Sequence, residues 1–235
     1  MTWNILLALV ILVVFWSLSR SMPVVLGGWV GRLAGKTETR LDDHLVEELD
    51  DATGRLALAV GLWLAWEALG LSGRFDAFLA TLFALAVVAT GSVLVFEALV
   101  ATFQFFSDPH EDAGRDMLRP FEARFRQMAG GLVALGGGML ALATVGVDGA
   151  LLGALALTAG LVGGLSLHAT LQELFAGLDL VRNSGWRPGV RVSIGEHTGT
   201  LVAVSPAAVT LDTADGQAQI ANSRALEEAV VQSQE

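Results

Sequence analysis

Five long apolar stretches dominate this chain of 235 residues and leave few folds open to it. A run of 18 or more apolar residues is long enough to cross the hydrocarbon core of a bilayer as a helix. The sequence is 53% hydrophobic and 16% charged, whereas an ordinary soluble domain carries about 25% charged residues. The expected class is therefore an α-helical membrane protein of about five transmembrane helices. With their flanking residues, these helices are expected at 5–18, 56–71, 77–106, 128–145 and 150–181.

The pattern changes after residue 186, where long apolar stretches give way to short alternating ones. Val190, Val192 and Ile194 are spaced by two, which is typical of a strand with one buried face. Two further apolar runs follow, and turns that contain glycine separate them. We predict a small soluble all-β domain at this end of the chain. The expected organisation is membrane helices over 1–147, a distinct last helix over 148–184 and the β-domain over 185–235.

The positive charges predict the orientation in the membrane. Of 14 lysine and arginine residues, only Arg74 falls in a loop that five spans would place outside. By the positive-inside rule, the N-terminus lies outside and the β-domain in the cytoplasm. We therefore expect a multi-pass protein of the inner (plasma) membrane. A cleaved signal peptide is the alternative for the first stretch, but it needs positive charge before its apolar core, and residues 1–4 carry none.

Composition and motifs argue against several functional classes. There is no cysteine, which removes disulfides and thiolate chemistry. The four histidines, His44, His110, His168 and His197, share no metal-ligand spacing. A formal net charge of −10 argues against nucleic acid, which needs a basic surface. No phosphate-binding loop or nucleophile motif is present. The sequence thus predicts no catalytic residues, no cofactor and no metal site, and we do not expect an enzyme.

The last apolar helix differs from the others because small residues recur along it. Gly153, Ala156, Gly160 and Gly164 follow one another at intervals of three or four residues, a pattern that lets helix backbones approach closely in a membrane. A second stripe lies on an adjoining face: Leu161, Leu165, His168 and Gln172. If several copies pack through their small residues, this stripe faces a central axis, where leucine rings can stop ions by dewetting. Ordinary helix packing, with the leucines facing lipid, is the alternative.

Residues 159–177 resemble the pore helix of the small-conductance mechanosensitive (MscS-like) channel family. The resemblance continues through residues 186–195, 199–204 and 213–216, and it ends at 220–223, where the family has the end of a strand. It covers residues 148–232 well and the upstream helices loosely. It implies that the β-domain is of the Sm/SH3-like type.

The resemblance also implies roles for residues of the last helix. Leu161 and Leu165 fall on the family's two constricting pore leucines, and Gly160 and Gly164 on its small packing positions. The family's helix kink falls near Ala169, flanked by His168 and Gln172. The resemblance places His168 near the pore, and a hydrogen-bonded packing histidine is the alternative.

The implied function is a mechanosensitive ion channel, opened by membrane tension, that releases ions and small solutes on hypo-osmotic shock. The expected partners are membrane lipid and further copies of the chain, which the family arranges as a heptamer. Several features depart from the family. Ala169 and His168 stand where glycine and glutamine are common, and Glu173 replaces a common asparagine. The sequence also stops before the family's C-terminal α/β cage domain, so we expect that domain to be absent. These departures leave a non-conducting membrane scaffold or regulatory subunit as the alternative.

Overall fold

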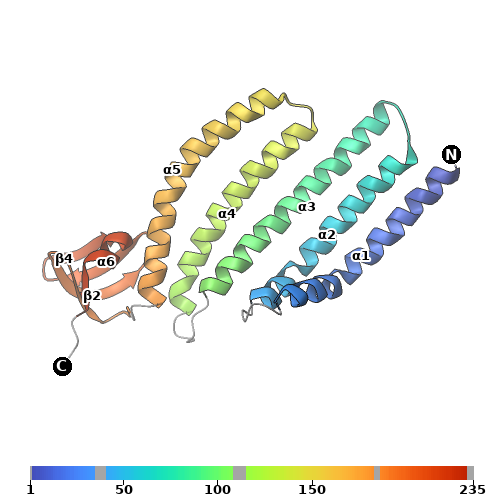
Figure 1. Cartoon of the computed structure of the whole chain (residues 1–235). Helices are drawn as coiled ribbons and strands as arrows, with labels where there is room; N and C mark the ends of the chain where they lie inside the picture. The colour runs from blue at the N-terminus through green and yellow to red at the C-terminus, as the bar shows by residue number, and fades with distance from the viewer. Residues whose placement is uncertain (1, 35–40, 108–114, 183–185, 232–235) are drawn as a thin grey trace. The chain divides into compact units, whose positions relative to one another are not determined.

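The computed structural model describes residues 2–34, 41–107, 115–182 and 186–231, with side chains for 2–21, 49–107, 117–182 and 186–228. Five long helices are followed by a small sheet (Figure 1). The elements in chain order are α1 (Thr2–Ala34), α2 (Leu41–Leu69), α3 (Arg74–Ser107), α4 (Arg115–Thr144), α5 (Gly149–Arg182), β1 (Arg191–Ile194), β2 (His197–Val204), β3 (Ala208–Thr213), β4 (Gly216–Ala221), α6 (Asn222–Glu228) and β5 (Ala229–Val231). The predicted fold class, membrane-type helices followed by a small antiparallel sheet, is confirmed.

The chain forms two compact units. The first unit comprises Met1–Phe105 and Ala129–Ala156, and the second comprises Phe106–Met128 and Leu157–Glu235. Among the described residues, four helical segments are long and apolar enough to cross a membrane: Thr2–Ser21, Arg74–Ser107, Met117–Thr144 and Gly149–Arg182. The helix α2 forms as well, but its apolar half follows a first half rich in acidic residues, so it does not reach the length of a span by composition.

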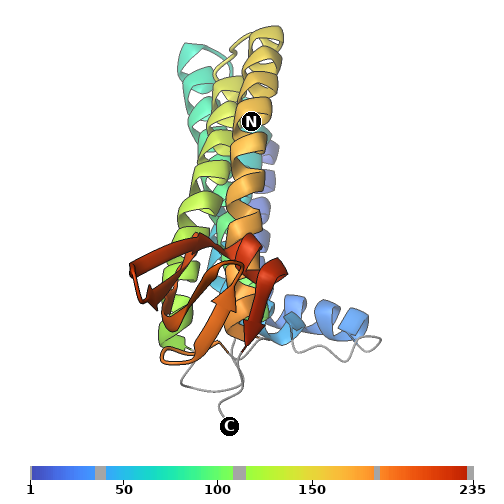
Figure 2. The same cartoon turned by 90° about the vertical axis from the view of Figure 1, so that its left-hand side faces the viewer.

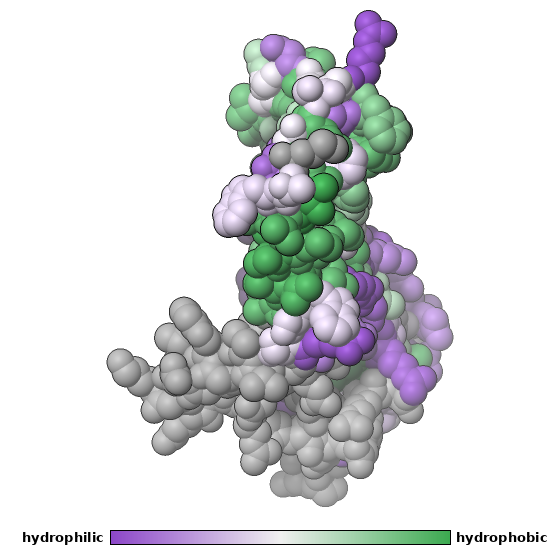
Figure 3. Space-filling view, turned by 90° about the vertical axis from the view of Figure 1, so that its right-hand side faces the viewer, coloured by the Kyte–Doolittle hydropathy of each residue, from purple (hydrophilic) through white to green (hydrophobic). Residues whose placement is uncertain are grey.

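Large apolar side chains cover the outside of the first unit. Along α1, those exposed include Leu6, Leu9, Val10, Val13 and Trp16. Figure 3 shows the α1 side as an apolar band between more hydrophilic regions. A soluble protein seldom exposes a continuous apolar surface of this kind, because its contact with water is unfavourable. The solvent that suits these helices is the hydrocarbon of a bilayer.

Small residues bring α1 and α2 close together. A Cβ atom on Gly61 would collide with the Cβ and ring of Phe15, and one on Gly54 would lie 3.1 Å from the carbonyl oxygen of Ser19. A side-chain hydrogen bond joins the two helices at their other ends, where Asn4 Nδ2 donates to the carbonyl oxygen of Leu69 at 3.1 Å. The helix pair is therefore fixed by close backbone approach, the usual means of helix packing in lipid.

Two polar contacts connect α2 to α3. Trp66 Nε1 donates to Asp76 Oδ1 at 3.0 Å, and Arg55 forms an ion pair with Glu97 at 3.7 Å between Nη2 and Oε1. The Trp66 contact lies near the α2–α3 turn, whereas Arg55 lies midway along α2 and Glu97 well before the end of α3. The two charges of this ion pair thus lie within their helices, where each has the other as a partner.

The small domain of the second unit is a five-stranded antiparallel sheet in the order β4-β3-β2-β1-β5. Its core consists of side chains from alternate strand positions: Val192, Ile194, Leu201, Val209, Leu211 and Ile220. These include the alternating residues that predicted the domain. The short helix α6 and the strand β5 were not predicted, because neither is long enough to show a periodic pattern.

The helix α4 begins at Arg115 rather than near residue 128, where the apolar stretch starts. Its first turns contain four arginines, which lower the mean hydropathy of the segment, so a search for apolar runs does not detect it. Leu118 and Phe121 are nevertheless buried, and they lie one turn apart on the same face. Pro120 stands in the second turn, where it removes a single helical hydrogen bond. The segment is thus an amphipathic extension of α4.

The close approach at Gly61 gives a test of the α1–α2 packing. We expect Gly61→Ala to lower the stability of the protein by about 1–3 kcal/mol, because the added methyl group meets the Phe15 side chain and the two helices must separate. Thermal unfolding in detergent measures the change. The matched control is Gly91→Ala on α3, whose Cβ would lie 3.9 Å from Leu56 Cδ1, an ordinary contact. Equal stability of the two variants would contradict the packing described here.

Candidate pore helix

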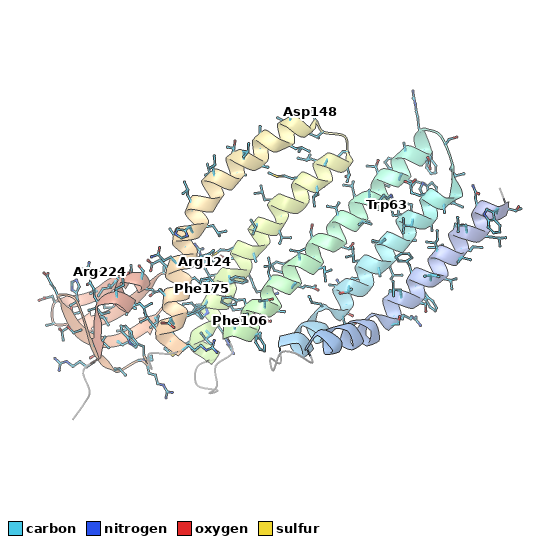
Figure 4. All side chains as sticks on the ribbon, viewed as in Figure 1. Trp63, Phe106, Arg124, Asp148, Phe175 and Arg224 are labelled. Carbon is cyan, nitrogen blue, oxygen red and sulfur yellow. The ribbon has the colours of Figure 1, made fainter. Side chains whose placement is uncertain are left out.

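A well-defined turn starts α5. Gly146 has a φ of 86°, a left-handed conformation that favours glycine, and it ends α4. Asp148 then accepts hydrogen bonds at Oδ1 from the backbone N–H groups of Ala150, at 2.9 Å, and Leu151, at 3.1 Å. Figure 4 shows Asp148 at the beginning of α5. Asp148 is therefore the N-cap residue of α5.

The leucine stripe of α5 is exposed. Leu161 retains 68% of its accessible surface and Leu165 retains 77%. His168 and Gln172, further along the same stripe, are also exposed. At about 100° per residue, all four side chains fall within a narrow arc of the helix. The described chain therefore leaves one continuous face of α5 without a partner, apolar at Leu161 and Leu165 and polar at His168 and Gln172.

The small residues beside this stripe are open as well. A Cβ atom placed on Gly153, Gly160 or Gly164 would meet nothing within 4 Å outside its own helical turn and chain neighbours. Ala156 is likewise exposed. The glycines at these positions are therefore not required by packing within the described chain. They leave room for the backbone of another helix.

The other side of α5 packs against the rest of the second unit. Leu174, Gly177 and Leu180 are buried. Measured around the helix, the face centred on Gly177 is roughly opposite the Leu161 stripe. A Cβ atom on Gly177 would lie 2.5 Å from Asn222 Nδ2 and 2.7 Å from Phe121 Cε1. Figure 2 shows the sheet and α6 beside this part of α5. One helix thus has a packed face and an open face.

A hydrogen-bonded junction joins α5 to the β-domain. The Glu173 carboxylate accepts from the backbone N–H of Ser223 at 3.1 Å and from Ser223 Oγ at 2.5 Å. Asn222 is fully buried, and its Nδ2 donates to the carbonyl oxygens of Glu173 at 3.0 Å and Ser205 at 2.8 Å. Its Oδ1 atom is buried without a hydrogen-bond partner in the described structure. Glu173 therefore caps the start of α6, and Asn222 holds α5, α6 and the loop after β2 together.

Sequence reasoning did not find this junction. Glu173 stood out only as a departure from a family pattern, and Asn222 only as the end of a strand. The two residues are about 50 positions apart, so no local pattern connects them. The available signal was chemical: a carboxylate and an amide in otherwise apolar or alternating surroundings need partners when they become buried.

The structure also describes the region of the expected kink. The helix α5 runs without interruption from Gly149 to Arg182, so its helical hydrogen bonding continues through Ala169. A bend at Ala169 stays a prediction. Beyond Ala169, Leu174 is fully buried, whereas Phe175, which is labelled in Figure 4, is 53% exposed. At the end of the helix, an Arg182 guanidinium N–H donates to the carbonyl oxygen of Phe106.

The junction predicts the effect of removing its carboxylate. We expect Glu173→Ala to lower the stability of the second unit by about 1–3 kcal/mol, because the Ser223 N–H and hydroxyl lose a charged acceptor. Hydrogen exchange at the amides of α6 should become faster. Glu196→Ala, in the exposed turn between β1 and β2, is the matched control and should leave exchange unchanged. Unchanged exchange in Glu173→Ala would show that the junction does not hold α6.

Comparison with known proteins gives a limited result. No family model and no curated protein sequence matches the chain. Two similar solved structures are cryo-EM structures of Arabidopsis thaliana MSL1, an MscS-like channel, and of a single-substitution variant. The first is 12% identical with a TM-score of 0.45, covering 80% of this chain and 63% of that chain. The second is 15% identical with a TM-score of 0.28, covering 77% and 61%.

This chain thus spans about three fifths of the length of the two MSL1 chains. They belong to the family that the sequence resembles. Likenesses at these TM-scores do not identify the function of this chain.

Proposed function

We propose that the chain forms a homo-oligomeric ion channel of the membrane, opened by tension, with α5 lining the pore. The observation that carries this proposal is the division of α5 into two faces. Its packed face holds the β-domain, while its other face presents Leu161, Leu165, His168 and Gln172 with no partner in the described chain. A helix used only for packing within one chain would not need a second face that is regular from Leu161 to Gln172.

Assembly of several copies accounts for the open face. The exposed Gly153, Gly160 and Gly164 allow a neighbouring helix to approach closely. Ala156 adds a further small position. Copies arranged in this way around an axis, seven of them if the family's ring applies, direct the Leu161 stripe inward. Membrane lipid surrounds the other helices, whose apolar side chains are exposed along α1 and α3.

The leucine rings supply a closed state. Apolar side chains that surround a narrow passage exclude water, and a dry constriction does not pass hydrated ions. Leu161 and Leu165 form two successive rings of this kind in the proposed oligomer. Tension favours the arrangement of helices that occupies the larger area in the membrane plane. Movement of α5 then separates the leucines, and ions and small solutes pass through the wetted pore.

The proposed orientation in the membrane follows from the positions of the positive charges. The arginines near the starts of α4 and β1 favour a cytoplasmic position for the β-domain and an external position for the N-terminus. The protein is then a multi-pass protein of the plasma membrane that responds to osmotic downshock. A non-conducting scaffold is the second candidate, and the alanine at position 169 favours it, because alanine is less able than glycine to adopt the backbone conformation of a sharp bend.

Replacement of Leu165, the second of the two leucines along α5, tests the proposal. We expect Leu165→Ser to give a channel that leaks without applied tension, because a hydroxyl ring allows the constriction to wet. Patch-clamp recording from liposomes under stepped suction measures the open probability of the variant and of the unchanged protein. The control is Val162→Ser, which alters an equally exposed residue (66%) on another face of α5.

The outcomes separate the two candidates. Pressure-dependent openings, with leak confined to Leu165→Ser, support the channel. Silence up to membrane rupture, with the oligomer confirmed in the same preparation, favours the scaffold. If Val162→Ser and Leu165→Ser altered the openings equally, the stripe from Leu161 to Gln172 would not line the pore.

A further inference from the structure

His168 is an ionisable side chain on the open face of α5 that the proposed gate does not use. It is exposed and lies one turn beyond Leu165, which corresponds to about 4.5 Å along the helix axis. No hydrogen bond or ion pair joins it to any residue in the described parts of the chain. Histidines in protein interiors usually have a partner for a ring nitrogen, so a packing role within one chain does not explain it.

Among the residues that the structure describes, no carboxylate forms an ion pair with His168. The closest carboxylate in sequence, Glu173, lies toward the opposite face of α5 and is engaged by Ser223. The preceding and following hydroxyls, those of Ser166 and Thr170, donate to carbonyl oxygens of their own helix. The imidazole is therefore left to interact with whatever occupies the axis of the oligomer.

A single chain offers no metal site at this position. Across the described residues, no group of three or more His, Asp or Glu side chains is placed to hold a metal ion. Rotational symmetry changes this, because each copy contributes a His168 at the same height around the axis. Several imidazoles that converge on one point form the donor set that Zn²⁺ and Ni²⁺ prefer, with metal–nitrogen distances of about 2.0–2.1 Å for zinc.

We propose that the His168 side chains of neighbouring copies form a binding site for a divalent transition-metal ion in the pore, below the Leu165 ring, and that the bound ion holds the pore closed. This inference rests on the proposed function, since the site is incomplete without the partner copies. The ion links α5 helices that must separate for the pore to open, so it stabilises the closed state. Gln172, one turn further along, supplies an amide oxygen that ligates such an ion only weakly.

The test uses Zn²⁺ on the full chain in liposomes, applied to each side of the patch in turn. We expect Zn²⁺ to reduce tension-evoked openings and a chelator to restore them. His168→Gln, which keeps a polar side chain of similar size, should lose the inhibition entirely. The matched control replaces the other three histidines together, as His44→Gln, His110→Gln and His197→Gln, and should retain the inhibition.

A binding measurement keeps this inference separate from the proposed function. Isothermal titration of the purified oligomer with Zn²⁺ should show a site that His168→Gln removes and the triple variant retains. If the channel opens under tension but Zn²⁺ neither inhibits it nor binds in a way that depends on His168, the metal site is wrong. The proposed channel function would stand in that case. His168-dependent binding to an oligomer that never conducts would support the site and count against the channel. Inhibition that persists in His168→Gln would overturn the site.

Discussion

A segment inside a bilayer must satisfy its own backbone hydrogen bonds, because hydrocarbon offers neither donors nor acceptors. This constraint explains why most of the chain consists of long helices and why the sheet appears only after α5 ends. It also changes what holds the helices together. Apolar side chains gain little by leaving lipid for protein, so packing depends on close approach. The Gly61–Phe15 contact between α1 and α2 is an example.

The helix α5 combines these rules with those of a soluble domain. Near Gly177 it packs as in a water-soluble protein, with buried apolar side chains and a hydrogen-bonded polar junction at Glu173 and Asn222. Near Gly160 it presents glycine and leucine to an environment that the single chain does not fill. The two behaviours occur on one uninterrupted helix. A displacement of α5 at either part is therefore transmitted to the other without a flexible connection.

The parts of the fold that the sequence predicted are those with strong local signals. The expected helix over 150–181 agrees closely with Gly149–Arg182, because Asp148 caps its start and the apolar pattern is uninterrupted. The strands around Val192 and Leu211 followed from alternation. The early start of α4 was not predicted, because Phe121 is buried by tertiary contacts, including the one with Gly177, that have no local sequence pattern. The junction of Glu173 with Ser223 was missed for the same reason: tertiary pairing has no local pattern. The pore residues stay a prediction.

The pairing of β1 with β5 has a consequence for biosynthesis. Val192 lies opposite Val231 in the sheet, and Ile194 opposite Ala229, so the first strand of the domain hydrogen-bonds to the last. The sheet cannot close until residue 231 has left the ribosome, and by then the whole of α5 has been synthesised. Non-local pairing of this kind is slow to form. The domain can therefore close only after the whole of α5 has been synthesised, and any contact that needs the closed sheet has to wait until translation has passed β5.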